Sequence, residues 1–177
     1  MKRIFKQSLF LLGLFLITSL GTLPPTKAAW NPTAICQRVG EKIDWHLTRY
    51  TEHKDKFVER VNEAIAKLKE INQKLKAKGC DTAKLEADYQ SLGTQLQAWV
   101  NDYNTFINLL NEAKTLACGQ SEGAYKEKVK QARLQIRTVR EKGVGIINYY
   151  NQTIKPDIEV LKSSCSLFIP TKAEIKE

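Results

Sequence analysis

Residues 85–117 read LEADYQSLGTQLQAWVNDYNTFINLLNEAKTLA, and this stretch decides the fold. Apolar residues recur in it at alternating gaps of four and three, the 3.5-residue period of helices that pack along a continuous seam. The ten seam positions, all of them apolar, are Leu85, Tyr89, Leu92, Leu96, Trp99, Tyr103, Phe106, Leu110, Ala113 and Ala117. The stretch therefore predicts one long helix with an apolar face turned toward neighbouring helices.

The same seam pattern occurs on both sides of this stretch. Before it, ten positions within 43–75 keep the period, and Lys54 is the only polar one among them. After it, the period holds over 125–150 and then slips before it resumes at Ile154, next to Pro156. Because proline removes a backbone donor and clashes with the preceding turn, we expect a kink there that resets the seam.

The three periodic segments predict three helices joined by short connections. Helix-capping residues support their boundaries, at Asn31-Pro32, Gly79 with Asp81, and Gly119 with Ser121. The expected helices span 32–78, 82–118 and 122–164. Because connections of about three residues force neighbouring helices to be antiparallel, we predict an all-α, coiled-coil-like, up-down-up three-helix bundle over residues 29–165. A flexible tail is expected at 166–177.

The four cysteines, Cys36, Cys80, Cys118 and Cys165, are separated by 44, 38 and 47 residues. Zinc ligands come in close pairs, so we expect disulfides and no bound metal. In the up-down-up topology Cys36 and Cys118 lie at one end of the bundle, and Cys80 and Cys165 lie at the other. Pairing across the ends would span about 60 Å, against the roughly 6 Å between Cα atoms that a disulfide allows. The predicted pairs are Cys36–Cys118 and Cys80–Cys165.

The first 28 residues have the pattern of a signal peptide. Lys2, Arg3 and Lys6 precede an apolar run over 9–20, and Ala28 suits cleavage. The run is well under the roughly 20 residues that a membrane-spanning helix needs, which favours a signal peptide over the alternative, a retained membrane anchor. Residues 1–28 hold four of the 28 basic residues and none of the 19 acidic ones, so the remaining chain carries a net charge of +5. We expect an exported protein that is periplasmic, bound at the cell surface or secreted.

One candidate interaction face lies near the start of the first helix. Arg38, Lys42, Trp45 and Arg49 share this face, and Trp and Arg are enriched at protein interfaces. The alternative is structural, with the Trp45 ring lying over the side chains of its basic neighbours.

A second candidate face is a basic stripe on the third helix, one residue past its seam. Its residues are Lys126, Lys130, Arg133, Arg137 and Arg140. This stripe has two interpretations. It is either a surface for an anionic partner, or a set of long side chains that cover the core and reach acidic residues of the second helix.

No combination of residues indicates catalysis. His46 and His53 are seven residues apart on one helix, about 10 Å along its axis, which is too far to share a metal ion on that helix alone. The sequence contains no recognisable nucleophile, base and acid set and no glycine-rich phosphate loop. We therefore expect no enzyme, no cofactor and no small-molecule substrate.

Three stretches carry a resemblance to other proteins. KGCDTAKLEADYQSL, ACGQSEGAYK and QTIKPDIEVL resemble, across most of the chain after residue 28, small secreted helical proteins of candidate-phylum bacteria whose activity is not established. The resemblance implies a bacterial envelope setting and no particular activity. The chain is also similar in size, basicity and long helices to periplasmic holdase chaperones of the Skp type, but it has four cysteines and no strand segment for trimerisation.

The expected function is a non-enzymatic interaction or structural module of the bacterial cell envelope. Its partner is expected to be a protein or an anionic polymer of the envelope. The alternatives are a periplasmic holdase chaperone and a protein that binds an anionic envelope polymer or nucleic acid through its basic helix faces.

Overall fold

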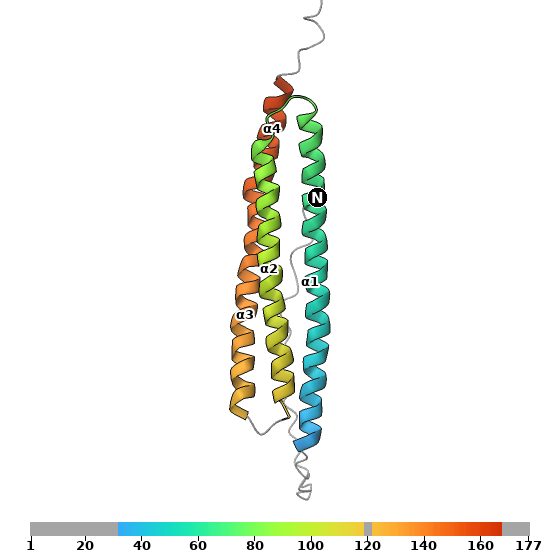
Figure 1. The fold of residues 1–177 in the computed structure, drawn as a ribbon, viewed down its shortest axis with the longest axis vertical. Coiled ribbons are helices and arrows are strands. Elements are labelled where there is room, and N and C mark those ends of the chain that lie inside the picture. The colour runs from blue at the N-terminus through green and yellow to red at the C-terminus, as the bar shows by residue number, and fades with distance from the viewer. Residues whose placement is uncertain (1–31, 119–121, 168–177) are drawn as a thin grey trace, which may run out of the picture. The chain divides into compact units, whose positions relative to one another are not determined.

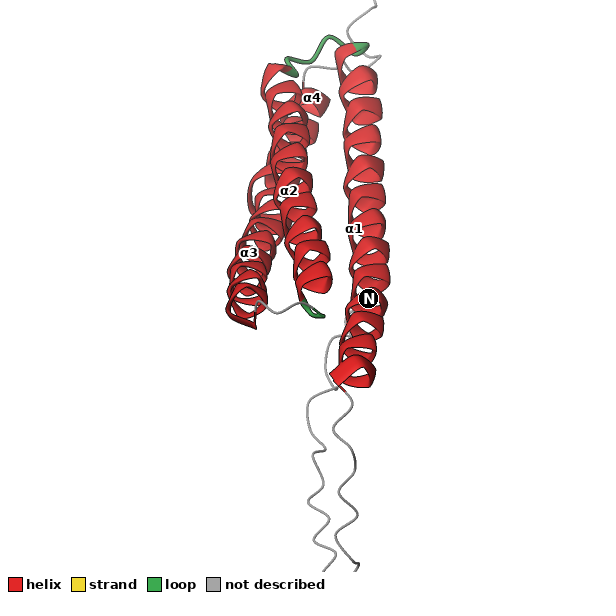
Figure 2. Cartoon of the chain, turned by 60° about the horizontal axis from the view of Figure 1, so that its bottom comes forward, coloured by secondary structure: helices red, strands yellow, loops and turns green. Residues whose placement is uncertain are grey.

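The computed structural model describes residues 32–118 and 122–167, and every regular element in them is helical (Figure 1). The elements are α1 (Pro32–Lys76), α2 (Ala83–Leu116), α3 (Glu122–Tyr149), the π-helical turn η1 (Tyr150–Ile154) and α4 (Lys155–Leu167). Because α3, η1 and α4 follow one another without a break, three antiparallel rods result (Figure 2). This arrangement confirms the predicted all-α, up-down-up bundle.

The helix ends lie close to the predicted ones. α1 and α2 each end two residues early, and α4 continues to Leu167, so residues 166 and 167 of the expected tail are helical. The N-cap residue of α2 is Thr82, one residue after the predicted Asp81, although the Asp81 Oδ1 accepts the backbone N–H of Ala83 at 3.1 Å. Several predictions fall outside the described residues: the signal peptide at 1–28, the caps at Asn31, Gly119 and Ser121, and the tail from 168 onward.

The apolar core follows α2, which lies between α1 and α3 and packs closely against both (Figure 1). All buried apolar side chains of the described residues occupy predicted seam positions; on α2 they are Leu85, Leu92, Leu96, Trp99, Tyr103, Phe106 and Ala113. Lys54, the polar member of the first seam, extends its ammonium group to the side-chain oxygen of Asn104 on α2, at 3.3 Å. The 3.5-residue period therefore identified the core correctly.

Two aromatic side chains, one helical turn apart on α2, bind its two neighbours. The Trp99 Nε1–H donates to the Val139 carbonyl of α3 at 2.9 Å, and the Tyr103 hydroxyl donates to the Tyr50 carbonyl of α1 at 2.8 Å. Burial raises the pKa of Tyr103 to about 12, so this hydroxyl keeps its proton at any physiological pH. The buried centre of the bundle thus has a directional bond to each outer helix.

The α2–α3 interface also contains a buried carboxylate. Asp88 is 6% exposed, and the Tyr149 hydroxyl donates to its Oδ1 at 2.9 Å. Nearby, Lys84 of α2 donates to Asp157 of α4 at 2.8 Å. Burial raises the pKa of Tyr149, and its hydrogen bond to Asp88 raises it further. Asp88 lies one residue before a seam position, where the periodic pattern did not predict burial.

The third rod accommodates the slip in its seam without a loop. In η1 the Lys155 N–H donates to the Tyr150 carbonyl, a bond five residues back in place of four. A π-helical turn holds one extra residue, which matches the one-residue slip before Ile154. Pro156 follows at once and has no N–H to offer the Gln152 carbonyl four residues earlier. Ile154 and Ile158 remain buried, so the π turn keeps the seam facing α2.

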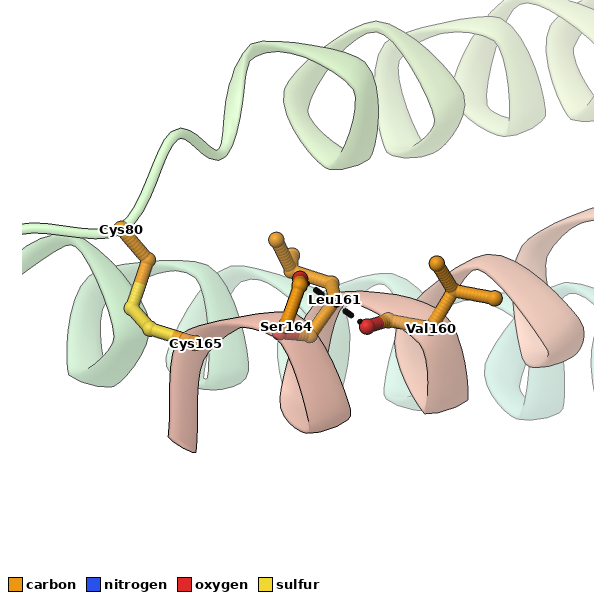
Figure 3. The surroundings of a disulfide bond; sticks show 5 residues. All are labelled: Cys80, Val160, Leu161, Ser164 and Cys165. Atoms are coloured by element: carbon orange, nitrogen blue, oxygen red, sulfur yellow. Dashed lines mark hydrogen bonds between the residues drawn. A yellow bond between two sulfur atoms is a disulfide. The ribbon is translucent and has the colours of Figure 1, made fainter. Parts of the chain in front are cut away.

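The end of α1 positions one of the disulfides. Gly79 has φ +80°, its N–H donates to Lys76 at 3.0 Å, and the Cys80 N–H donates to Leu75 at 3.2 Å. This pair of bonds is the Schellman motif, which favours glycine at the left-handed position. The motif turns the chain so that Cys80 meets Cys165 of α4 (Figure 3).

Both predicted disulfides are confirmed. Cys36 pairs with Cys118, with 5.0 Å between their Cα atoms, and Cys80 pairs with Cys165 at 5.7 Å. The first joins the start of α1 to the end of α2, and the second joins the α1–α2 connection to α4.

Reduction of the disulfides is expected to lower the stability of the bundle. They close loops of 82 and 85 residues, for which the chain-entropy model gives at most about 4.5 kcal/mol each. Urea unfolding with and without reductant measures the loss, and Cys→Ser pairs at each end separate the two contributions. A Cys36–Cys80 or Cys36–Cys165 peptide in a non-reducing digest of the folded monomer would overturn this topology.

Two glycines of α3 are expected to respond oppositely to alanine. A Cβ at Gly145 meets no atom within 4 Å, whereas a Cβ at Gly143 lies 3.1 Å from Nε1 of Trp99. Gly145→Ala should raise the free energy of unfolding by about 0.5–1 kcal/mol through helix propensity. Gly143→Ala should lower it, because overpacking costs about 1–3 kcal/mol. An equal rise in the free energy of unfolding of both variants, measured by urea unfolding, would mean that the Trp99 indole moves aside at no cost.

Candidate binding groove

A groove lies between α1 and α3, with α2 as its floor. Among the described residues, close helix packing involves α1 with α2 and α2 with α3, but not α1 with α3. At the Cys36–Cys118 end this leaves a hollow of about 410 Å³. Its apolar lining includes Ile43 of α1, Phe106 and Leu110 of α2, and Val129 and Ile136 of α3.

A second hollow of about 210 Å³ lies further along the same three helices. Phe57 and Val61 of α1, Leu92 of α2, and Ile146 and Ile147 of α3 line it. On α1 the two hollows lie within 39–64, about 37 Å at 1.5 Å per residue, and residues 51–56 between them line neither hollow. We refer to both hollows as the α1–α3 groove. Its floor on α2 is covered, since Leu92, Phe106 and Ala113 are 1%, 2% and 0% exposed. Its exposed apolar surface lies mainly on the walls, where Ile43, Val129 and Ile136 are half-buried and Ile147 is exposed.

The α1 rim of the groove is basic. The residues one position before successive seam positions are Lys42, His46, Arg49, His53, Lys56 and Arg60. Three of them, Lys42, His46 and Arg60, line the groove. The His46 ring also stacks on Tyr50, with 6.0 Å between ring centroids. We call this series the α1 basic rim.

The α3 rim consists of the predicted basic stripe and its continuation. Arg133 lines the groove, and the spacing of the stripe continues to Val144 and Ile147, which are 51% and 49% exposed. Ile147 lines the second hollow. The stripe of Lys126, Lys130, Arg133, Arg137 and Arg140, here called the α3 basic rim, thus lies on the same helix face as the groove.

The other flank of α3 makes the ion pairs with α2. Lys128 pairs with Glu112, and Lys142 pairs with Asp102. By contrast, four members of the α3 basic rim have no carboxylate partner among the described residues: Lys130, Arg133, Arg137 and Arg140. Glu112 and Asp102 of α2 are therefore paired with lysines on the opposite side of the seam and not with these four residues.

The structure separates the first predicted face into two parts. Lys42 lines the groove, whereas Trp45 is 54% exposed and lies outside the groove lining. The Arg49 guanidinium lies over the Trp45 ring, 4.8 Å from its centroid. Arg49 thus makes the cation–π contact that the structural alternative describes, and Arg38 is exposed.

Neither the groove nor the places of His46 and Arg60 in its wall was predicted from the sequence. The sequence did contain a usable signal. The residues that come one position before six successive seam residues of α1 are all Lys, Arg or His. The openness of the groove depends on how the helices are spaced, which no local pattern records.

The chemistry available in the groove is apolar contact and positive charge. Within 32–118 and 122–167, no three His, Cys, Asp or Glu side chains cluster as metal ligands do. The same ranges contain no helix with an apolar window long enough to cross a membrane. Comparisons with protein-family models, with curated proteins and with solved structures found no match.

The two basic rims are expected to destabilise the free protein, because like charges border the same groove. Replacing Arg133, Arg137 and Arg140 by Gln should raise the free energy of unfolding by about 0.5–1 kcal/mol at low salt, with little change in helix propensity. The gain should shrink as added salt screens the charges, since the Debye length is about 3 Å at 1 M. Urea unfolding is the suitable measurement because urea is uncharged.

The matched control for this variant is on the opposite flank of the same helix. Replacing Lys128 and Lys142 by Gln removes two ion pairs with α2 and should lower stability by up to about 1 kcal/mol. The repulsion between the rims would be contradicted if the arginine variant lost stability as the lysine variant does. It would also be contradicted if the stability gained by the arginine variant did not depend on salt.

Proposed function

We propose that this chain is a non-enzymatic interaction module of the bacterial cell envelope, and that it binds its partner in the α1–α3 groove. The observation that supports this function is a groove with apolar walls and basic residues along its rims. It lies between α1 and α3, which do not pack closely on each other, whereas both pack closely on α2. Exposed apolar surface rimmed by polar residues marks interaction sites in folded proteins.

Location outside the cytosol is supported by the cysteines. All four are paired, and such disulfides are typical of proteins in an oxidising, extracytosolic compartment. The signal-peptide pattern of residues 1–28 and the likeness to secreted bacterial proteins support a cell-envelope location in particular.

The proposal of binding without catalysis follows from the groove lining. Nucleophilic and acid–base catalysis needs a nucleophile with a base in hydrogen-bond reach. The polar groups that line the groove include Lys42, His46, Arg60 and Arg133, and His46 contacts aromatic rings. These groups are suited to attracting and orienting an anionic partner.

A photoreactive side chain tests the site. Ile147 and Leu134 are both apolar residues of α3 and are 49% and 55% exposed, but only Ile147 lines the groove. A benzophenone amino acid at either position, in the full chain in intact cells, is illuminated, and the adducts are separated by mass. We expect discrete adducts from position 147 and not from 134. Equal adducts from both positions, or none from 147, would contradict the proposed site.

The holdase alternative predicts a different selectivity. A holdase accepts unfolded chains in general, whereas an interaction module binds a particular partner. Suppression of the aggregation of an unfolded outer-envelope protein at near-stoichiometric amounts would favour the chaperone. We expect no such suppression at these amounts.

A further inference from the structure

We propose that the occupant of the α1–α3 groove is an acidic amphipathic helix of a partner protein, which completes a four-helix bundle. This inference rests on the function proposed above and adds the chemical class of the partner.

The first argument is the pattern of helix contacts. In a closed three-helix bundle each helix packs against both others, whereas in a four-helix bundle the first and third helices are diagonal and both flank the second and fourth. Here α1 and α3 each pack on α2 but not closely on each other. α1 and α3 are therefore farther from each other than either is from α2, which is the relation of the two diagonal helices in a four-helix bundle.

The second argument is the length and lining of the groove. Its span of about 37 Å matches a helix of about 25 residues at 1.5 Å per residue. Its lining includes half-buried seam side chains from all three helices, among them Ile43, Leu110, Val129 and Ile136. A helix with apolar residues at the same period can pack its side chains between them.

The third argument is charge. In helical bundles the residues that flank the apolar seam determine partner choice through opposite charges. Lys42, His46 and Arg60 of the α1 basic rim line the groove on one side, and Arg133 of the α3 basic rim lines it on the other. Four arginines and lysines of the α3 basic rim have no carboxylate partner among the described residues. An occupant with acidic residues on both flanks of its seam would neutralise both rims.

Other occupants fit these observations less well. A second copy of the chain would bring basic rims against basic rims, while Asp102, Glu112 and Asp44 already have lysine partners. A polyanion without apolar groups would leave the exposed apolar wall residues, such as Ile147, uncovered, and an unfolded client has no fixed 3.5-residue period. These three occupants predict distinct results in the experiment below.

The experiment uses a synthetic probe helix and the full, disulfide-bonded chain. The probe is a 25-residue peptide with Leu at the seam positions and Glu on both flanks. One control peptide has the same composition with the leucines moved out of the 3.5-residue period, and another has Lys in place of the flanking Glu. Calorimetry at two temperatures and circular dichroism measure affinity, heat-capacity change and helix formation.

The acidic peptide should bind, gain helix on binding and show a negative heat-capacity change, the mark of apolar burial. Both control peptides should bind at least tenfold more weakly. Arg133→Gln with Arg137→Gln and Arg140→Gln should weaken the acidic peptide at least tenfold, and Ile147→Glu should do so as well. The matched variants, Lys128→Gln with Lys142→Gln and Leu134→Glu, should change its affinity less than twofold.

Several outcomes would overturn the inference. Polyglutamate binding as tightly as the acidic peptide would identify a polyanion site, and equal binding of the rearranged peptide would identify a holdase surface. Concentration-dependent dimerisation that excludes the peptide would identify a second copy as the occupant. If no peptide binds while photoadducts at position 147 persist, the helical occupant is wrong and the binding function stands. Peptide binding without adducts in cells would contradict the cellular function alone.

Discussion

Burial of the α2 seam from two sides at once is the constraint on which the bundle depends. Leu92 and Phe106 are 1% and 2% exposed, although each lies on a helix that has only two neighbours. Each such side chain, when fully buried, contributes about 1.5–3 kcal/mol, so a helix of this length cannot leave its seam in water. The hydrogen bonds of Trp99 and Tyr103 add direction to this burial, because one reaches α3 and the other reaches α1. The outer helices are held in register by α2 and not by each other.

The distribution of charge follows from this central position. α2 contributes the carboxylates of Asp102 and Glu112, and lysines of α3 on the flank facing α2 pair with them. The flanks of α1 and α3 that border the groove are both basic, so closer contact between them is opposed by repulsion. Of the three possible helix pairs, two are therefore complementary and one is not. The same positive charge supports the proposed binding of an anionic partner on this side.

The disulfides and the π turn keep this arrangement in place at the ends. Cys36–Cys118 holds α1 to α2 beside the larger hollow, and Cys80–Cys165 holds the α1–α2 connection to α4. η1 admits one extra residue, so that Ile158 still faces the core after the slip of the seam. The groove thus lies in a framework cross-linked at both ends, which limits the entropy lost when a partner binds.

Much of the fold was determined by the sequence alone. A 3.5-residue period predicts which side chains are buried, because burial depends on the helix face, and the short connections and topology then left one possible disulfide pairing. Local chemistry also predicted Gly79 as a helix stop and a kink next to Pro156 that resets the seam, whereas the structure accommodates the slip in a π turn over Tyr150–Ile154. What only the tertiary structure decided is the angle at which α1 and α3 sit around α2. The same seams can pack with all three helices in mutual contact, or with α1 and α3 in contact with α2 but apart from each other. The period specifies which face of a helix is buried and not how many helices share that face. The groove beside Arg133 and Ile147, and the burial of Asp88, depend on that choice of angle.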